Sequence, residues 1–191
     1  MSGTGRPLGA LLAGGRASRL GGRKATLPVG GRPLLERPLA ALREVCGEVC
    51  VVAKRDTVLP PLGRGVRLWV EPDEPRHPLT GIGHALRGAG GRPLVVCAAD
   101  MPLVTPEVFS RLLATPPGDA VAVVPRARGR LQPVCALYLP GALSGLSGFA
   151  VDARTTDVVA ALGIEEVEFG EVETFMSVNT PEDLERVAAM L

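Results

Sequence analysis

Short apolar runs alternate along the chain with stretches in which apolar residues recur every three or four positions. The runs have the length of strands and lie between turn residues. They cover residues 8–13, 49–53, 66–70, 94–98, 120–124 and 134–139, with a shorter run near 167. Helical spacing is found over residues 33–44, 80–86, 106–113 and 155–162, and a last stretch begins at 180. The pattern predicts strands that alternate with helices.

This alternation predicts the fold class. Strands that are apolar throughout are buried on both faces, and parallel strands need a helical crossover between them. We therefore expect an α/β fold of three layers with a mainly parallel, Rossmann-like sheet, in a single domain over residues 1–191. Thr80 and Thr105 are the expected caps of two helices. Thr180, followed by Pro181 and two acids, is a strong start for the last helix.

The composition fits one globular domain and argues against some partners. Of 191 residues, 46% are hydrophobic, which is enough for a core of its own. The 21 Lys and Arg residues against 20 Asp and Glu leave a formal net charge of +1, so we expect no general attraction to nucleic acid or to anionic membranes. The 24 glycines and 18 prolines are scattered between the apolar runs and serve as turn residues.

Neither the cysteines nor the histidines indicate a metal site or a catalytic triad. Cys46, Cys50, Cys97 and Cys135 lack the paired spacing of zinc ligands, and we expect buried free thiols. The two histidines, at 77 and 84, have no neighbours that suggest a triad, and we assign neither a catalytic role. No apolar run approaches the roughly 18 residues of a membrane span, and the first residues do not look like a signal peptide. We expect a reduced, cytoplasmic protein.

The segment after the first apolar run has the features of a phosphate site. Residues 12–24 hold four glycines, no acid and four cations, at positions 16, 19, 23 and 24. Glycines let backbone N–H groups approach an anion, while Arg19 and Lys24 match the oxygens of a di- or triphosphate. The alternative is a basic surface loop. A Walker A loop and a G-x-G-x-x-G loop are both absent from the sequence.

Two further polar segments follow predicted strands, where ligands bind in open α/β sheets. Asp100 comes directly after the run 94–98, where its carboxylate is placed to hold Mg²⁺; the alternative is a turn or capping aspartate. Three acids, among them Glu71 and Asp73, follow the run 66–70 between prolines. They form either a stiff loop that presents a carboxylate to a base or a ribose, or an ordinary solvated loop.

Taken together, these segments resemble the nucleotidyltransferases that open with L-A-G-G-x-x-x-R-[ML]-G-x-x-K. The matching residues are Leu12-Ala13-Gly14-Gly15, Arg19-Leu20-Gly21 and Lys24. Within that superfamily the chain is most similar to the MobA-like molybdenum cofactor guanylyltransferases. The similarity spans nearly the whole chain, through Gly31-x-Pro33-Leu34, Pro78-Leu79-x-Gly81-Ile82, Cys97-x-x-Asp100-x-Pro102, Gln132-Pro133-x-Cys135-Ala136-Leu137-Tyr138 and Val178-Asn179-Thr180-Pro181-Glu182-Asp183-Leu184.

The resemblance implies a Mg²⁺-dependent transfer of GMP from GTP to the terminal phosphate of molybdopterin, with release of pyrophosphate. It implies a nucleotide half over residues 8–104, a pterin half over 105–191, and cofactor-receiving enzymes as further partners. Arg19, Lys24 and Asp100 are the implied catalytic residues, with Asp100 as the Mg²⁺ ligand and Asn179 as a substrate-binding residue. The implied GTP-binding residues are Leu12, Ala13, Gly14, Gly15, Lys24, Glu71 and Asp100.

Three departures from the family pattern bear on the choice of base. Arg23 stands where the family often has Asp, Glu71 or Asp73 stands where it often has Asp, and His77 stands where it prefers Gly. A cytidylyltransferase for the same pterin, or a transferase for another small phosphate, therefore remains an alternative. A nucleotide-binding module without catalysis is a second alternative, against which Lys24 and Asp100 argue.

Overall fold

The computed structural model describes residues 6–14 and 24–191, and these form a mixed central sheet of eight strands. The order across the sheet is β10-β7-β9-β6-β1-β4-β5, and β8 pairs with β7. The strands are β1 (Leu8–Leu12), β4 (Glu48–Ala53), β5 (Val66–Val70), β6 (Leu94–Ala98), β7 (Ala122–Ala127), β8 (Arg130–Leu131), β9 (Cys135–Tyr138) and β10 (Ile164–Phe169).

Most neighbouring strands run parallel, as their continuous apolar sequences predict. β1 pairs in parallel with β4 and β6, β4 with β5, and β7 with β10. The exception is β9, which runs antiparallel to both β6 and β7. The C-terminal ends of β1, β4, β5 and β6 therefore lie at one edge of the sheet, which we call the carboxyl edge.

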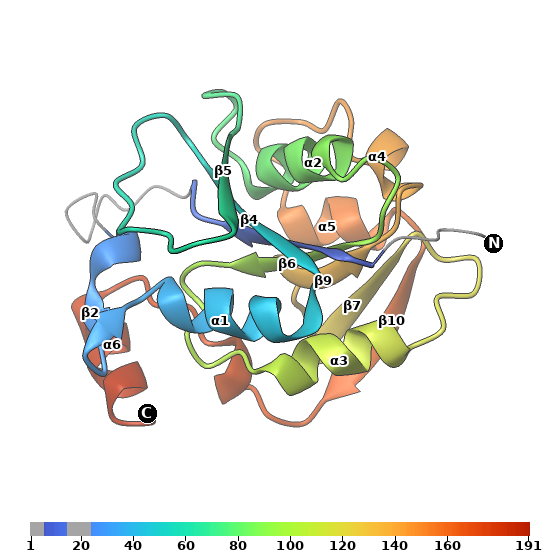
Figure 1. The fold of residues 1–191 in the computed structure, drawn as a ribbon. Helices are drawn as coiled ribbons and strands as arrows, with labels where there is room; N and C mark the ends of the chain where they lie inside the picture. Colours follow the sequence, from blue (N-terminus) through green and yellow to red (C-terminus); the bar gives the residue numbers. More distant parts are fainter. Residues whose placement is uncertain (1–5, 15–23) are drawn as a thin grey trace.

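Helices cover both faces of the sheet and make the predicted three layers (Figure 1). One face is covered by α1 (Glu36–Val45) and α3 (Pro106–Ala114), the other by α2 (Pro78–Gly88), α4 (Ala142–Gly145) and α5 (Thr155–Ala160). Successive strand residues face opposite layers: Ala10 packs with the α2 side and Leu11 with the α1 side, and both are fully buried. Each face of the sheet thus packs against a layer of helices through its own buried apolar cluster.

A small accessory sheet holds the last helix against the body of the protein. β2 (Pro28–Val29) and β3 (Arg32–Pro33) pair in antiparallel fashion, and α6 (Pro181–Ala188) packs beside β2. Val29, Leu34, Val178 and Val187 form a buried apolar cluster between them. The chain just before α6 is thereby brought next to the chain just before α1 (Figure 1).

Two predicted helix starts are wrong. α1 begins at Glu36 rather than at 33, because residues 32–33 pair with β2. α2 begins at Pro78, and its N-cap is His77, whose Nδ1 accepts a hydrogen bond from the Leu79 N–H at 3.2 Å. Thr80 is no cap, since its hydroxyl donates to the Pro75 carbonyl at 2.9 Å.

The cap of α3 and several short elements also differ from the prediction. Thr105 lies at the predicted N-cap position, but its side chain makes no capping bond to the backbone. The apolar pattern does not predict β2, β3, β8, α4 or the 3₁₀ helices η2 (Lys24–Thr26) and η3 (Glu173–Phe175). These elements are too short to show a period.

The expectation for the cysteines is confirmed. All four are free and buried. Burial raises the pKa of the Cys46 and Cys50 thiols to about 12, so both stay protonated near neutral pH. Within residues 6–14 and 24–191, no helix has both the length and the apolar character needed to cross a membrane.

Candidate active site

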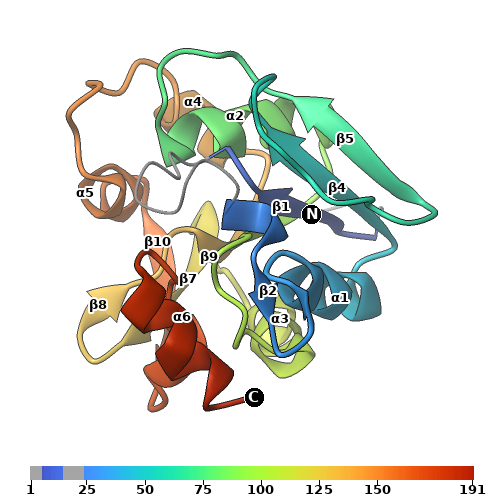
Figure 2. The same ribbon diagram turned by 90° about the vertical axis from the view of Figure 1, so that its left-hand side faces the viewer.

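The carboxyl edge positions the residues that follow each strand. The ladder continues one residue beyond β1, β5 and β6: Ala13 N–H donates to Val52 O at 2.8 Å, Glu71 N–H to Ala53 O at 3.0 Å, and Ala99 N–H to Leu12 O at 2.9 Å. This edge of the sheet faces the viewer in Figure 2. A cavity of about 360 Å³ opens at it. The sheet hydrogen bonds therefore fix the positions of the backbone segments that line the cavity.

One group of polar side chains on this cavity joins residues far apart in sequence. The Lys24 ammonium donates to Oδ2 of Asp100 at 2.5 Å and to Oδ1 of Asn179 at 2.9 Å. Asp100 follows β6, Lys24 opens η2, and Asn179 immediately precedes the N-cap of α6. The Val178 N–H also donates to the Asp100 carbonyl at 2.9 Å. The C-terminal segment is thus tied directly to the loop that carries Asp100.

The Asp100 carboxylate fits a metal that is bound mainly through the substrate. Its contact with Lys24 uses Oδ2, and its side chain is 25% exposed. In the part of the chain that the structure describes, no three His, Cys, Asp or Glu side chains cluster closely enough to enclose a metal ion. Mg²⁺ in nucleotide sites commonly takes one or two carboxylates together with substrate phosphates. Asp100 could therefore hold a divalent metal together with phosphate oxygens of a substrate.

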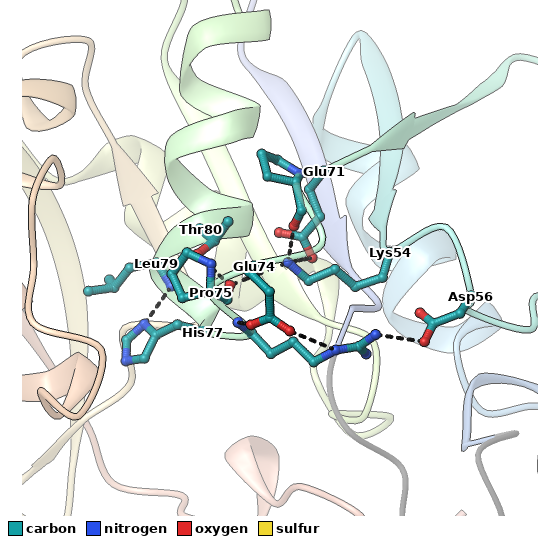
Figure 3. A network of polar contacts seen from close by, with 10 residues as sticks. Lys54, Asp56, Glu71, Glu74, Pro75, His77, Leu79 and Thr80 are labelled. Carbon is teal, nitrogen blue, oxygen red and sulfur yellow. Dashed lines mark hydrogen bonds and ion pairs between the residues drawn. The ribbon is translucent and has the colours of Figure 1, made fainter.

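Figure 3 shows a second polar group, in which the Lys54 side chain points toward Glu71 and the loop that follows it. Lys54 directly follows β4 and Glu71 directly follows β5, and these residues are 3% and 5% exposed. The Lys54 ammonium lies 3.5 Å from Oε1 of Glu71, donates to the Pro72 carbonyl, and lies 3.4 Å from the Pro75 carbonyl. Lys54 thus holds both the carboxylate and the loop that follows it.

The other oxygen of Glu71 is unsatisfied. Oε2 is buried and has no hydrogen-bond partner among the described residues. Burial raises the pKa of this carboxyl, and the nearby Lys54 ammonium partly offsets the rise. The carboxylate lies close to two glycines: a Cβ at Gly14 would be 2.0 Å from Oε1, and one at Gly81 would be 3.0 Å from Oε2. A side chain at position 14 therefore has no room beside this carboxylate, and one at position 81 would be in tight contact with it.

Most of the predicted site residues line this one cavity. Those that do are Leu12, Ala13, Gly14, Lys24, Glu71, Asp100 and Asn179. Gly15 and Arg19 lie outside the described residues, so their predicted roles stay predictions. Asp73 is exposed and does not line the cavity, so Glu71 is the better placed of the two acids.

The histidines and one missed lysine complete the description. His77 lines the cavity, but both ring nitrogens are engaged: Nδ1 with the Leu79 N–H and Nε2 with the Ala153 carbonyl at 3.0 Å. Sequence reasoning missed Lys54. Its position directly after the apolar run 49–53 is the same kind of signal as the position of Asp100 after the run 94–98.

An open α/β sheet with lysine, carboxylate and glycine residues gathered at its carboxyl edge defines a nucleotide-binding class of protein. A comparison with family profiles narrows the class: the MobA-like NTP transferase domain matches residues 9–167. The chain belongs to this family and is a nucleotidyltransferase.

A relative agrees with this assignment, and solved structures share the fold. The chain is 34% identical to the molybdenum cofactor guanylyltransferase of Cereibacter sphaeroides over 193 residues, 97% of each chain. Its fold is similar to that of molybdopterin-guanine dinucleotide biosynthesis protein A from Archaeoglobus fulgidus, with a TM-score of 0.71, 22% identity and coverage of 96% and 97%. A nucleotidyl transferase from Methanothermobacter gives a TM-score of 0.78 at 19% identity, with 97% of each chain covered.

Proposed function

We propose that this nucleotidyltransferase transfers GMP from GTP to the terminal phosphate of molybdopterin and releases pyrophosphate. The observation that carries the proposal is the meeting of Lys24, Asp100 and Asn179 at one point of the cavity wall. It is supported by relatives of more than 30% identity over nearly the whole chain that are named molybdenum cofactor guanylyltransferases. We further propose that the reaction takes place in the cytoplasm and that molybdoenzymes receive the product.

Lys24 is the cation proposed to neutralise the triphosphate. Without nucleotide its ammonium is held by Asp100 and Asn179, which fix it at the cavity. A bound α-phosphate offers the same ammonium an anionic oxygen, and preorganised charge of this kind stabilises a transition state at little reorganisation cost. Arg19 is proposed to assist it.

Asp100 is proposed to hold Mg²⁺. A bound Mg²⁺ would polarise phosphate oxygens and neutralise charge on the leaving pyrophosphate. The Asp100 carbonyl also accepts from the Val178 N–H at 2.9 Å, which ties the segment that carries Asn179 to the loop of Asp100. This contact supports the proposal that the Asn179 segment binds the acceptor and that the chain divides into a nucleotide half and a pterin half.

The proposed chemistry is an in-line displacement. An anionic oxygen of the acceptor phosphate forms a bond to the α-phosphorus, and the bond from that phosphorus to the bridging α,β oxygen breaks as pyrophosphate leaves. A phosphate oxygen is already charged near neutral pH and needs no general base. His77, whose two nitrogens are engaged, is therefore not required as one. Positioning and charge neutralisation carry the catalysis.

The test has two steps. Calorimetric titration with GTP, CTP, ATP and UTP, each with Mg²⁺, should give clear selectivity for GTP. Incubation with molybdopterin and GTP labelled at the α-phosphate should then give labelled dinucleotide and stoichiometric pyrophosphate. A preference for CTP would replace this proposal with a cytidylyl transfer, and binding of no nucleotide would point to a module without catalysis.

A further inference from the structure

The chain has only two lysines, and both lie at the carboxyl edge. Lys24 and Lys54 account for two of the 21 basic residues, and all the others are arginines. Lys24 has an evident task at the Asp100 cluster. Lys54 is the more deeply buried, with its side chain 1% exposed, and no step of the proposed reaction uses it.

The Lys54 ammonium faces three oxygens of the described residues. An ammonium has three donors, and the Lys54 ammonium faces one carboxylate oxygen and two carbonyls, from Glu71, Pro72 and Pro75. No donor is left for a nucleotide. Lys54 can therefore influence a ligand only through what it holds in place.

What Lys54 holds in place is a carboxylate with one free acceptor. Oε1 of Glu71 faces Lys54, whereas Oε2 is buried near Gly81 and has no hydrogen-bond partner within residues 6–14 and 24–191. A buried acceptor left unpaired costs free energy, so Oε2 calls for a donor from a ligand. Val58 and Pro78 are among the residues that line the same cavity, and they add apolar surface to it. An unpaired acceptor together with apolar surface suits a flat base with N–H donors in its plane.

We propose that Lys54 is a positioning residue for base selection: it anchors Oε1 of Glu71 so that Oε2 accepts from the ring N–H and the exocyclic amino group of guanine. The inference rests on the proposed use of GTP and adds the residue that makes the site selective. Arg76, a second cation near Glu71 among the described residues, is paired with Asp56 at 2.6 Å and anchors the same loop from outside. The two anchors can therefore be tested separately.

The measurement is the ratio of dissociation constants for ITP and GTP, each with Mg²⁺, by calorimetry on the full chain. ITP differs from GTP only in lacking the 2-amino group, so the ratio reports the hydrogen bond to that group. For a bond to a charged acceptor we expect ITP to bind roughly 10- to 100-fold more weakly than GTP. The ratio does not depend on the fraction of folded protein, so a merely structural role of Lys54 would not change it.

Four proteins form the cycle: wild type, Lys54→Met, Glu71→Gln and the double variant. Lys54→Met should bring the ratio close to that of Glu71→Gln, and adding Lys54→Met to Glu71→Gln should not change it further. Lys54→Met leaves a buried carboxylate unpaired and is at risk of unfolding. Should it not fold, Lys54→Arg takes its place: the positive charge is kept but its donors no longer fit Oε1 of Glu71, so its ratio should also fall towards that of Glu71→Gln, and a wild-type ratio would overturn the inference.

Asp56→Asn is the matched control, since it releases Arg76 from the same loop and leaves Lys54 and Glu71 in contact. Its ratio should equal that of the wild type. The inference is overturned if Lys54→Met keeps the wild-type ratio, if Glu71→Gln does, or if Asp56→Asn lowers the ratio as much as Lys54→Met. Failure of wild type to bind GTP at all would instead reject the proposed function.

Discussion

At the scale of single residues, the candidate site depends on a few side chains whose neighbours leave them little freedom. Lys24 is 17% exposed and held between two acceptors, and Glu71 is held between Lys54 and two glycines. Such groups are placed before the substrate arrives. Substitutions of these residues should therefore change either the affinity for GTP or the turnover number, and the two effects can be measured separately.

Lys24→Ala should lower kcat by about 100- to 1000-fold, the range seen when a single preorganised donor to a transition-state oxyanion is removed. Asp100→Asn should instead weaken the dependence on Mg²⁺, because an amide is a poor ligand for a hard cation. Initial rates of pyrophosphate release over a range of Mg²⁺ concentrations measure both effects. Circular dichroism checks the fold. Unchanged turnover of Lys24→Ala would remove this lysine from the mechanism.

Gly14→Ala should weaken GTP binding strongly. The new Cβ would lie 2.0 Å from Oε1 of Glu71 and must displace this buried carboxylate. Gly83→Ala is a matched control, because its Cβ would meet nothing closer than the end of Arg87 at 3.9 Å, and alanine favours a helix. Calorimetry with MgGTP measures both variants, and equal affinities would contradict the tight packing described at Gly14.

At the scale of elements, α6 links local sequence to the site. Thr180 and Asp183 form a capping box, in which the Thr180 hydroxyl accepts from the Asp183 N–H at 3.2 Å and Asp183 Oδ2 accepts from the Thr180 N–H at 3.0 Å. The same oxygen accepts from the Asn179 N–H at 2.9 Å. The start of this helix was predicted from the sequence, since threonine, proline and acids are a local signal. Its contact with Lys24 was not, because a pairing across 155 positions leaves no local trace.

Thr180→Ala should destabilise the protein by about 1 kcal/mol, the usual cost of removing a helix cap, and raise KM for the acceptor more than Kd for GTP. The loss of stability caused by Asp183→Asn should depend on pH, because the wild-type carboxylate titrates and the asparagine does not. Hydrogen bonds from Asn179 and Thr180 hold the Asp183 pKa below its ordinary value of 3.8. A lowered pKa stabilises the fold above that value, and the benefit is lost as the pH falls through the folded-state pKa.

Thermal melts of wild type and Asp183→Asn at pH 7, 5 and 3 measure this effect. The difference in melting temperature should be similar at pH 7 and 5 and smaller at pH 3. A constant difference at all three values would mean that the Asp183 charge makes no contribution.

At the scale of the whole molecule, the sequence predicted the layers better than the contacts between them. Continuous apolar runs determine which strands are buried, so the mainly parallel sheet and its covering helices could be predicted. The reversed direction of β9 could not, because residues 135–138 are as apolar as a parallel strand. The partners of Lys54 likewise depend on β4 and β5 ending side by side, which only the assembled sheet reveals.

Because the cavity is built by residues from position 12 to position 179, bound nucleotide should stabilise the whole fold. At a concentration 100 times its Kd, MgGTP adds about 2.7 kcal/mol to the free energy of unfolding. For a chain of this size that corresponds to a rise in melting temperature of roughly 5–10 °C. Differential scanning fluorimetry with GTP and Mg²⁺, and again with EDTA in place of Mg²⁺, measures it. The rise should be much smaller with EDTA, and Asp100→Asn should give the small rise under both conditions. An equal rise with and without Mg²⁺ in wild type would mean that GTP binds without the metal and that Asp100 has another task.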